Sequence, residues 1–256
     1  PRRCGAERTE RSGQGLCGMP TTPVVARAAL HPWEEPVLCG SGGAGTVFFS
    51  GCNLGCVYCQ NHAISAENFG KAISIKRLRE IFLELIDRGA KTIELVTATH
   101  FVPFILPALE EPLPVPVVYN CGGYESVHTV AFLRKKVQCW LPDLKYYDAE
   151  ISGKYSDAPD YFERASAAIE QMFKETEHYV IGADGILQRG VLIRHLILPG
   201  QVEDTKRILE YVAETFEPGD VLFSLMRQYT PCGRAAEFPE IDRRITDEEY
   251  EACESY

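Results

Sequence analysis

The sequence predicts an α/β protein whose core is a partial barrel of six parallel strands. Short apolar runs rich in Val, Ile and Phe alternate with stretches of helical periodicity, the pattern of a parallel sheet with helices outside. Polar side chains follow several of these runs, where a barrel gathers its active site. An open, doubly wound sheet would gather them less completely, and we therefore favour the barrel.

Six apolar runs are expected to form the strands, because turn residues or helical stretches separate them. They span residues 46–49, 92–97, 115–120, 139–146, 191–198 and 221–226. A loop with three cysteines follows the first run. The segment 179–190 is predicted to be a β-hairpin that turns on Asp184 and Gly185, a favoured pair for a tight turn.

Helical periodicity fills the intervals between the runs. Over 74–88 the apolar residues fall on one helical face, and Gly89 is expected to end that helix. Three further helices are expected around 126–136, after Pro159 and over about 203–216. Thr246 and Glu249 have the spacing of a capping box, which predicts one more helix near the end of the chain.

Composition and charge narrow the functional classes. A chain of 256 residues that is 45% hydrophobic and 24% charged can bury one sizeable core. Its formal net charge of −10 argues against a nucleic-acid partner, which would be bound through a basic face. No apolar run reaches the roughly 18 residues of a membrane span, so no membrane partner is expected.

Three parts are expected along the chain. Residues 1–39 form an N-terminal segment with Cys4 and Cys17, residues 40–230 form the barrel, and residues 231–256 form a C-terminal extension. The chain starts without Met, and its last predicted helix has room for only about two turns. We therefore expect both end segments to be truncated, and it stays open whether Cys4 and Cys17 belong to a second metal site completed by residues upstream.

The loop after the first strand holds Cys52, Cys56 and Cys59 in the spacing C-x3-C-x2-C. Three adjacent cysteines cannot all pair locally as disulfides, which favours reduced thiols that bind metal. Three thiolates on a cubane [4Fe-4S] cluster leave one iron open to a substrate or cofactor. The alternative is a structural zinc site of four ligands, completed by Cys39 or His62.

At these residues the chain resembles the radical S-adenosylmethionine (SAM) superfamily, whose signature is this spacing with an aromatic residue, here Tyr58, before the last cysteine. Over about residues 30 to 250 it is similar to the little-characterised pyruvate formate-lyase-activating-enzyme-like branch. The similar segments are "GSGGAGTVFFSGCNLGCVYCQN", "VVYNCGGYE", "LPDLKY", "IRHLILPG" and "LMRQYTP". The resemblance implies a partial (β/α)6 TIM-like barrel, one [4Fe-4S] cluster on the three cysteines, and SAM on the open iron.

The resemblance also implies which residues bind SAM, although it singles out no catalytic side chain. They are Tyr58, Thr97, Thr99, Asn120, Asp143, Lys145 and Arg194. The segment "VTATH" stands where many members have Gly-Gly-Glu, so backbone near Thr97 or the Thr99 hydroxyl must serve the SAM amino group. Each of these roles has a structural alternative. Thr97 and Thr99 would belong to a threonine-rich strand end, Asn120 would be an ordinary turn residue, and Asp143 would form an ion pair with Lys145 at the barrel rim. Arg194 lies in an apolar strand and needs a partner.

The function implied is reductive cleavage of SAM to a 5′-deoxyadenosyl radical, which abstracts hydrogen from a substrate. No further cysteine lies in the fourteen residues between Cys59 and Ser74, as in minimal activases, so a glycyl-radical enzyme is the expected substrate. An electron donor such as flavodoxin or ferredoxin and a reducing cytoplasm are also implied. Three alternatives stay open: a radical SAM enzyme for a peptide or small molecule, one that modifies RNA, and a non-catalytic metal-binding or redox module.

Overall fold

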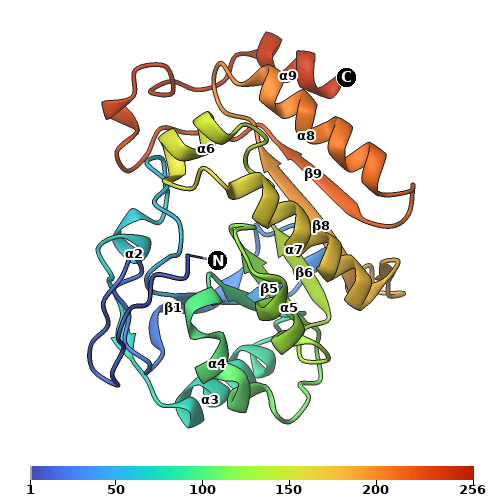
Figure 1. The fold of residues 1–256 in the computed structure, drawn as a ribbon. Coiled ribbons are helices and arrows are strands. Elements are labelled where there is room, and N and C mark those ends of the chain that lie inside the picture. Colours follow the sequence, from blue (N-terminus) through green and yellow to red (C-terminus); the bar gives the residue numbers. More distant parts are fainter. Residues whose placement is uncertain (1) are drawn as a thin grey trace.

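Six parallel strands form the centre of the computed structural model, which describes residues 2–256 (Figure 1). They are β2 (Ala44–Phe49), β4 (Ile93–Val96), β5 (Val117–Cys121), β6 (Cys139–Pro142), β8 (Leu187–Leu196) and β9 (Leu222–Met226). Each pairs with the next in parallel register, in that order. The predicted α/β class and the six parallel strands are confirmed.

Helices connect most of these strands. They are α1 (Pro36–Cys39), α2 (His62–Ser65), α3 (Ile75–Asp87), α4 (Val102–Ile105), α5 (Val127–Leu133), α6 (Ala149–Ser156), α7 (Tyr161–Thr176), α8 (Val202–Thr215) and α9 (Asp247–Glu254). Short 3-10 turns lie at η1 (Thr99–Phe101), η2 (Leu106–Leu109) and η3 (Ala235–Glu237). The predicted helices correspond to α3, α5, α7, α8 and α9. Helices α1, α2, α4 and α6 were not predicted.

Side-chain caps mark the starts of predicted helices, among them α3 and α9. The hydroxyl of Ser74 accepts a hydrogen bond from the Arg77 N–H at 3.1 Å and so caps α3. Thr246 and Glu249 form the predicted capping box at the start of α9. Nowhere in residues 2–256 does the structure contain a helix with the length and apolar content needed to span a membrane.

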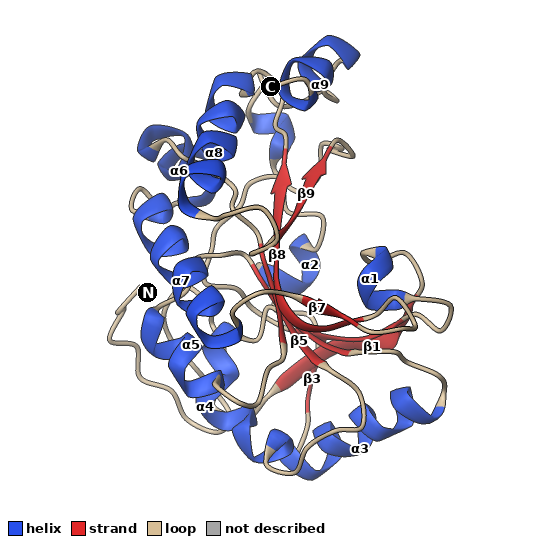
Figure 2. Ribbon diagram, turned by 90° about the vertical axis from the view of Figure 1, so that its right-hand side faces the viewer, coloured by secondary structure: helices blue, strands red, loops and turns tan. Residues whose placement is uncertain are grey.

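The sheet curves without closing into a full barrel. Between residues 2 and 256 no ladder joins β9 to β2. Figure 2 shows α3, α4, α5 and α7 on the convex side of the sheet, and α2, which follows the cysteine loop in the sequence, on the other side. This arrangement confirms the predicted partial barrel and leaves one side of it open.

Three antiparallel strands extend the sheet. They are β1 (Val24–His31) beside β2, β3 (Lys71–Ala72) beside β1, and β7 (Val180–Ile181) beside the start of β8. The last pair is the predicted hairpin, in which Gly185 has a φ of +79°. Strand β1 lies inside the segment 1–39 and was not predicted, because its alanines give little strand signal. The boundaries of the three expected parts stay a prediction.

Candidate functional site

The three-cysteine loop begins directly after β2, at the carboxyl end of the parallel sheet. Gly51 starts it with a φ of +78°, which residues with a side chain rarely adopt. The N–H of Gly55 donates to the Ser156 carbonyl at 3.1 Å, and the N–H of Val57 donates to the Tyr155 carbonyl at 2.9 Å. The loop is therefore held against the last turn of α6.

Each cysteine sulfur in this loop has a hydrogen-bond donor. The pairs are the Leu54 N–H with Cys52 Sγ at 3.4 Å, the Ser156 hydroxyl with Cys56 Sγ at 2.9 Å, and the Ser65 hydroxyl with Cys59 Sγ at 3.2 Å. Donors of this kind stabilise the negative charge on sulfurs that bind iron. Neither serine was predicted.

Burial raises the pKa of the Cys52 thiol to about 12 and also raises the pKa of Cys56. The ammonium of Lys145 acts in the opposite direction on both thiols, because a positive charge favours thiolates. Within residues 2–256, no three His, Cys, Asp or Glu side chains are arranged around one common metal ion. In a [4Fe-4S] cluster each thiolate binds a different iron, and three thiols from one loop fit that donor set.

Cys39 cannot complete a zinc site with these cysteines. It ends α1, before β2 begins, whereas Cys52 follows β2. A strand of this length separates its ends by about 20 Å, and the Cys39 thiol donates to the Glu34 carbonyl at 3.4 Å instead. His62, the other candidate fourth ligand, has its Nδ1 atom 3.2 Å from a carboxylate oxygen of Glu67.

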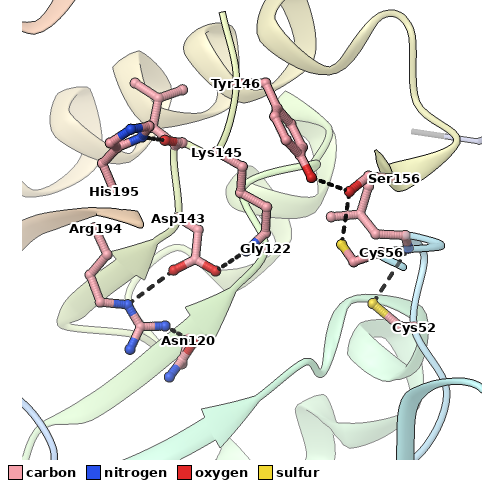
Figure 3. Close-up of polar contacts among 12 residues, drawn as sticks. Cys52, Cys56, Asn120, Gly122, Asp143, Lys145, Tyr146, Ser156, Arg194 and His195 are labelled. Atoms are coloured by element: carbon pink, nitrogen blue, oxygen red, sulfur yellow. Dashed lines mark hydrogen bonds and ion pairs between the residues drawn. The ribbon is translucent and has the colours of Figure 1, made fainter. Parts of the chain in front are cut away.

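Four of the residues predicted to bind SAM form one hydrogen-bonded group, here called the charged group (Figure 3). Its contacts are Arg194 Nε with Asp143 Oδ1 at 3.0 Å, Arg194 Nη2 with Asn120 Oδ1 at 2.8 Å, and Lys145 Nζ with Asp143 Oδ2 at 2.6 Å. The residues come from β5, β8 and the segment after β6. In Figure 3 Lys145 lies on the side of Asp143 that faces the cysteine loop.

The charged forms of Asp143 and Lys145 are favoured although these side chains and that of Arg194 are only 15–17% exposed. Burial acts to raise the pKa of Asp143, but the charges of Lys145 and Arg194 outweigh it and lower that pKa. Burial likewise acts to lower the pKa of Lys145, and Asp143 outweighs it and raises that pKa. The ion pair considered as an alternative for Asp143 and Lys145 is therefore present in the structure.

Two further acidic residues, neither of them predicted, extend the charged group. Glu94 lies on β4, is fully buried and accepts a hydrogen bond from the Asn120 amide. Glu34 lies with its Oε1 atom 3.3 Å from Arg194 Nη1. Burial and then the nearby Glu34 raise the pKa of Glu94 to about 8. A glutamate within the apolar run "TIELVT" was the signal that could have revealed it.

The two threonines predicted to bind SAM lie in different surroundings. Thr97 has a φ of +59°, a strained value for a β-branched residue, and its N–H donates to the Asn120 carbonyl at 2.9 Å. The Thr99 hydroxyl donates to Glu125, whose pKa burial raises to about 7. The hydroxyl of Thr99 is thus already engaged by a buried carboxyl group.

Tyr58, the aromatic residue before the last cysteine, is buried beneath the loop. Its hydroxyl lies 2.5 Å from the hydroxyl of Tyr146. Its ring packs edge-on against Tyr229 with ring centroids 5.8 Å apart. Tyr58 thus links the cysteine loop to the segments after β6 and β9.

Comparison with known proteins supports a cluster site. A family model described as "4Fe-4S single cluster domain" matches residues 38–101, which include all three loop cysteines. The chain is 29% identical over 233 residues to the uncharacterised protein MJ0674 of Methanocaldococcus jannaschii. That match covers 87% of this chain and 63% of the relative, so the chain spans less than two thirds of that protein.

The fold is shared with SuiB of Streptococcus suis. The crystal structure of SuiB bound to precursor peptide SuiA matches with a TM-score of 0.50 and 15% identity, over 77% of this chain and 40% of SuiB. The crystal structure of SuiB bound to S-adenosylmethionine matches with a TM-score of 0.48 and 13% identity, over 78% of this chain and 52% of SuiB. The matched family model and the shared fold together agree with a 4Fe-4S domain built on a mixed α/β sheet.

Proposed function

We propose that this chain is a radical SAM enzyme, in which Cys52, Cys56 and Cys59 hold a [4Fe-4S] cluster and the charged group binds SAM. The observation that carries the proposal is the three-thiol loop in which every sulfur has its own hydrogen-bond donor. The family model that spans this loop supports it. When bound and reduced, such a cluster supplies the electron that splits SAM into methionine and a 5′-deoxyadenosyl radical.

The chain's own side chains bind and orient SAM in this proposal. An ammonium has three N–H groups, so Lys145 can hold Asp143 and a SAM carboxylate at the same time. Arg194 holds Asn120 and Asp143 in fixed positions, from which the second amide hydrogen of Asn120 and the unused lone pairs of the Asp143 carboxylate can contact the ribose hydroxyls. The side chains of Asp143, Lys145 and Arg194 are only 15–17% exposed, which limits the access of water to the site.

For the substrate we propose a polypeptide, with a glycyl-radical enzyme as the first candidate. The open side between β9 and β2 suits a protein loop that enters the barrel. The second candidate is a free peptide, which the fold shared with peptide-bound SuiB favours. An electron donor such as flavodoxin or ferredoxin, in a reducing cytoplasm, completes the proposal.

The proposal is tested with anaerobically reconstituted protein. We expect about four irons per chain, and release of 5′-deoxyadenosine and methionine when dithionite and SAM are added. Replacing Cys52, Cys56 and Cys59 together by alanine should abolish both. Cys253→Ala, which removes a buried thiol from α9, is the matched control and should behave as the wild type. One zinc per chain, or normal turnover by the triple variant, would contradict the proposal.

The substrate is tested separately. Reduced protein, SAM and a glycyl-radical enzyme of the same organism are expected to give a glycyl doublet in electron paramagnetic resonance (EPR). If SAM is cleaved but no such enzyme gives the doublet, the activase assignment fails and deuterated peptides become the next substrates to follow. Transfer of deuterium from a peptide to 5′-deoxyadenosine would establish the second candidate.

A further inference from the structure

The donor to Cys56 stands at the end of a chain of hydroxyl groups. The Ser156 hydroxyl lies 2.9 Å from Cys56 Sγ, the Tyr146 hydroxyl lies 2.6 Å from Ser156 Oγ, and the Tyr58 hydroxyl lies 2.5 Å from the Tyr146 hydroxyl. Tyr146 and Ser156 are fully buried and Tyr58 is 7% exposed. Figure 3 shows Ser156 between Tyr146 and Cys56, with a dashed line to each.

Iron on Cys56 would fix the direction of every hydrogen in this chain. A thiolate bound to iron has no proton and can only accept, so Ser156 must donate its single hydrogen to the sulfur. Ser156 Oγ then accepts from Tyr146, and the Tyr146 oxygen accepts from Tyr58. Hydrogen bonds aligned in one direction polarise one another, and a buried setting strengthens them.

We propose that Tyr58, Tyr146 and Ser156 form a hydroxyl relay that raises the reduction potential of the cluster, with Tyr146 as a positioning residue. The inference rests on the proposed function, since it concerns a cluster on Cys56. A hydrogen bond to a cluster sulfur stabilises the reduced, more negative state more than the oxidised state. The relay also couples the potential to α6 (Ala149–Ser156), whose last residue supplies the final donor.

The relay can be removed without removing the loop's backbone contacts. Ser156 holds the loop through its carbonyl oxygen, which accepts from the Gly55 N–H at 3.1 Å, and Ser156→Ala keeps that carbonyl. Tyr146→Phe keeps the ring, which packs edge-on against Tyr161 at 5.3 Å between centroids. Tyr155→Phe is the matched control, because the neighbouring Tyr155 hydroxyl donates to Glu240 at 2.8 Å instead of to the relay.

The test is an EPR-monitored redox titration of the reconstituted holoprotein. Ser156→Ala is expected to lower the one-electron reduction equilibrium constant about tenfold, which corresponds to a midpoint lower by about 59 mV. Tyr146→Phe is expected to lower it about threefold, since Ser156 keeps its own bond but loses the polarising neighbour. The control Tyr155→Phe should leave the midpoint unchanged.

Iron content separates the two ways in which the idea could fail. If the wild type assembles no iron-sulfur cluster, the proposed function itself fails. If all variants carry a full complement of iron and the midpoint of Ser156→Ala equals that of the wild type, the relay fails while the proposed function stands. If Ser156→Ala loses its cluster, the relay is tested by the midpoint potential of Tyr146→Phe alone. A midpoint equal to that of the wild type in this variant would overturn the relay.

Discussion

Arg194 is the residue whose removal should damage the charged group most. Its guanidinium contacts Asp143 at 3.0 Å, Asn120 at 2.8 Å and Glu34 at 3.3 Å, from a side chain that is 15% exposed. In Arg194→Ala, Asp143 keeps the ammonium of Lys145 at 2.6 Å, but Glu34 loses its cation inside the barrel. We expect the variant to be less stable and to bind SAM more weakly.

The magnitude follows from these contacts. Breaking a buried ion pair by removing one partner costs about 3 to 5 kcal/mol, because a charge is left uncompensated. Two features reduce this cost: Lys145 still neutralises Asp143, and the raised pKa of nearby Glu94 favours its uncharged form. We therefore expect a loss of about 3 kcal/mol in the free energy of unfolding. Arg194→Lys should lose less, because it keeps the charge, although an ammonium cannot reproduce the planar fork.

The assay is urea unfolding of the iron-free protein, followed by the fluorescence of the buried Trp140 on β6. Arg164→Ala is the control: Arg164 pairs with Asp160 at 3.0 Å and is 40% exposed, so its loss should cost under about 1 kcal/mol. SAM binding to iron-loaded Arg194→Ala should weaken by about 1 to 3 kcal/mol. If Arg194→Ala and Arg164→Ala lose the same free energy of unfolding, the contacts of Arg194 in the charged group do not stabilise the fold more than an exposed ion pair does.

Two further predictions concern the support of the site. Gly123 has a φ of +77°, and a Cβ there would lie 2.0 Å from the Asp143 carbonyl oxygen. Gly123→Ala should therefore lose about 3 kcal/mol in the free energy of unfolding, measured in urea, and wild-type stability of this variant would contradict the prediction. Burial lowers the pKa of His195 to about 4, whereas its value in the unfolded chain is near 6.5. As the pH falls from about 6.5 to about 4, the unfolded chain takes up a proton at this residue and the folded chain does not, so the folded state becomes less stable. Between pH 7 and 5 the wild type should lose about 2 kcal/mol relative to His195→Gln, and a constant difference between the two proteins would refute the buried neutral ring.

The strands of the barrel could be predicted because each has a run of apolar residues. The carboxyl ends of parallel strands lie at the same end of a barrel, so the polar residues that follow the strands could be predicted to gather there. Asn120, Asp143, Lys145 and Arg194 do so. Their roles toward SAM stay a prediction. Strand β1 was missed because alanine carries no strand preference, and its place is decided by pairing with β2.

The partners of the predicted residues could not be predicted from the sequence. Ser156 lies a hundred positions from Cys56, and nothing in the local pattern indicates that its hydroxyl reaches that sulfur. The same holds for Glu34 and Arg194, which lie 160 positions apart in the sequence. Such contacts depend on how the sheet curves and on which way each side chain points.

The central claim is that three cysteines hold the cluster and leave one iron open for SAM. It is tested most directly by the EPR spectrum of the reduced, iron-loaded protein with and without SAM. We predict that saturating SAM changes the g-values, because SAM binds the iron that no cysteine holds. A spectrum that stays the same at saturating SAM would contradict the claim and indicate a cluster whose irons are all held by the protein.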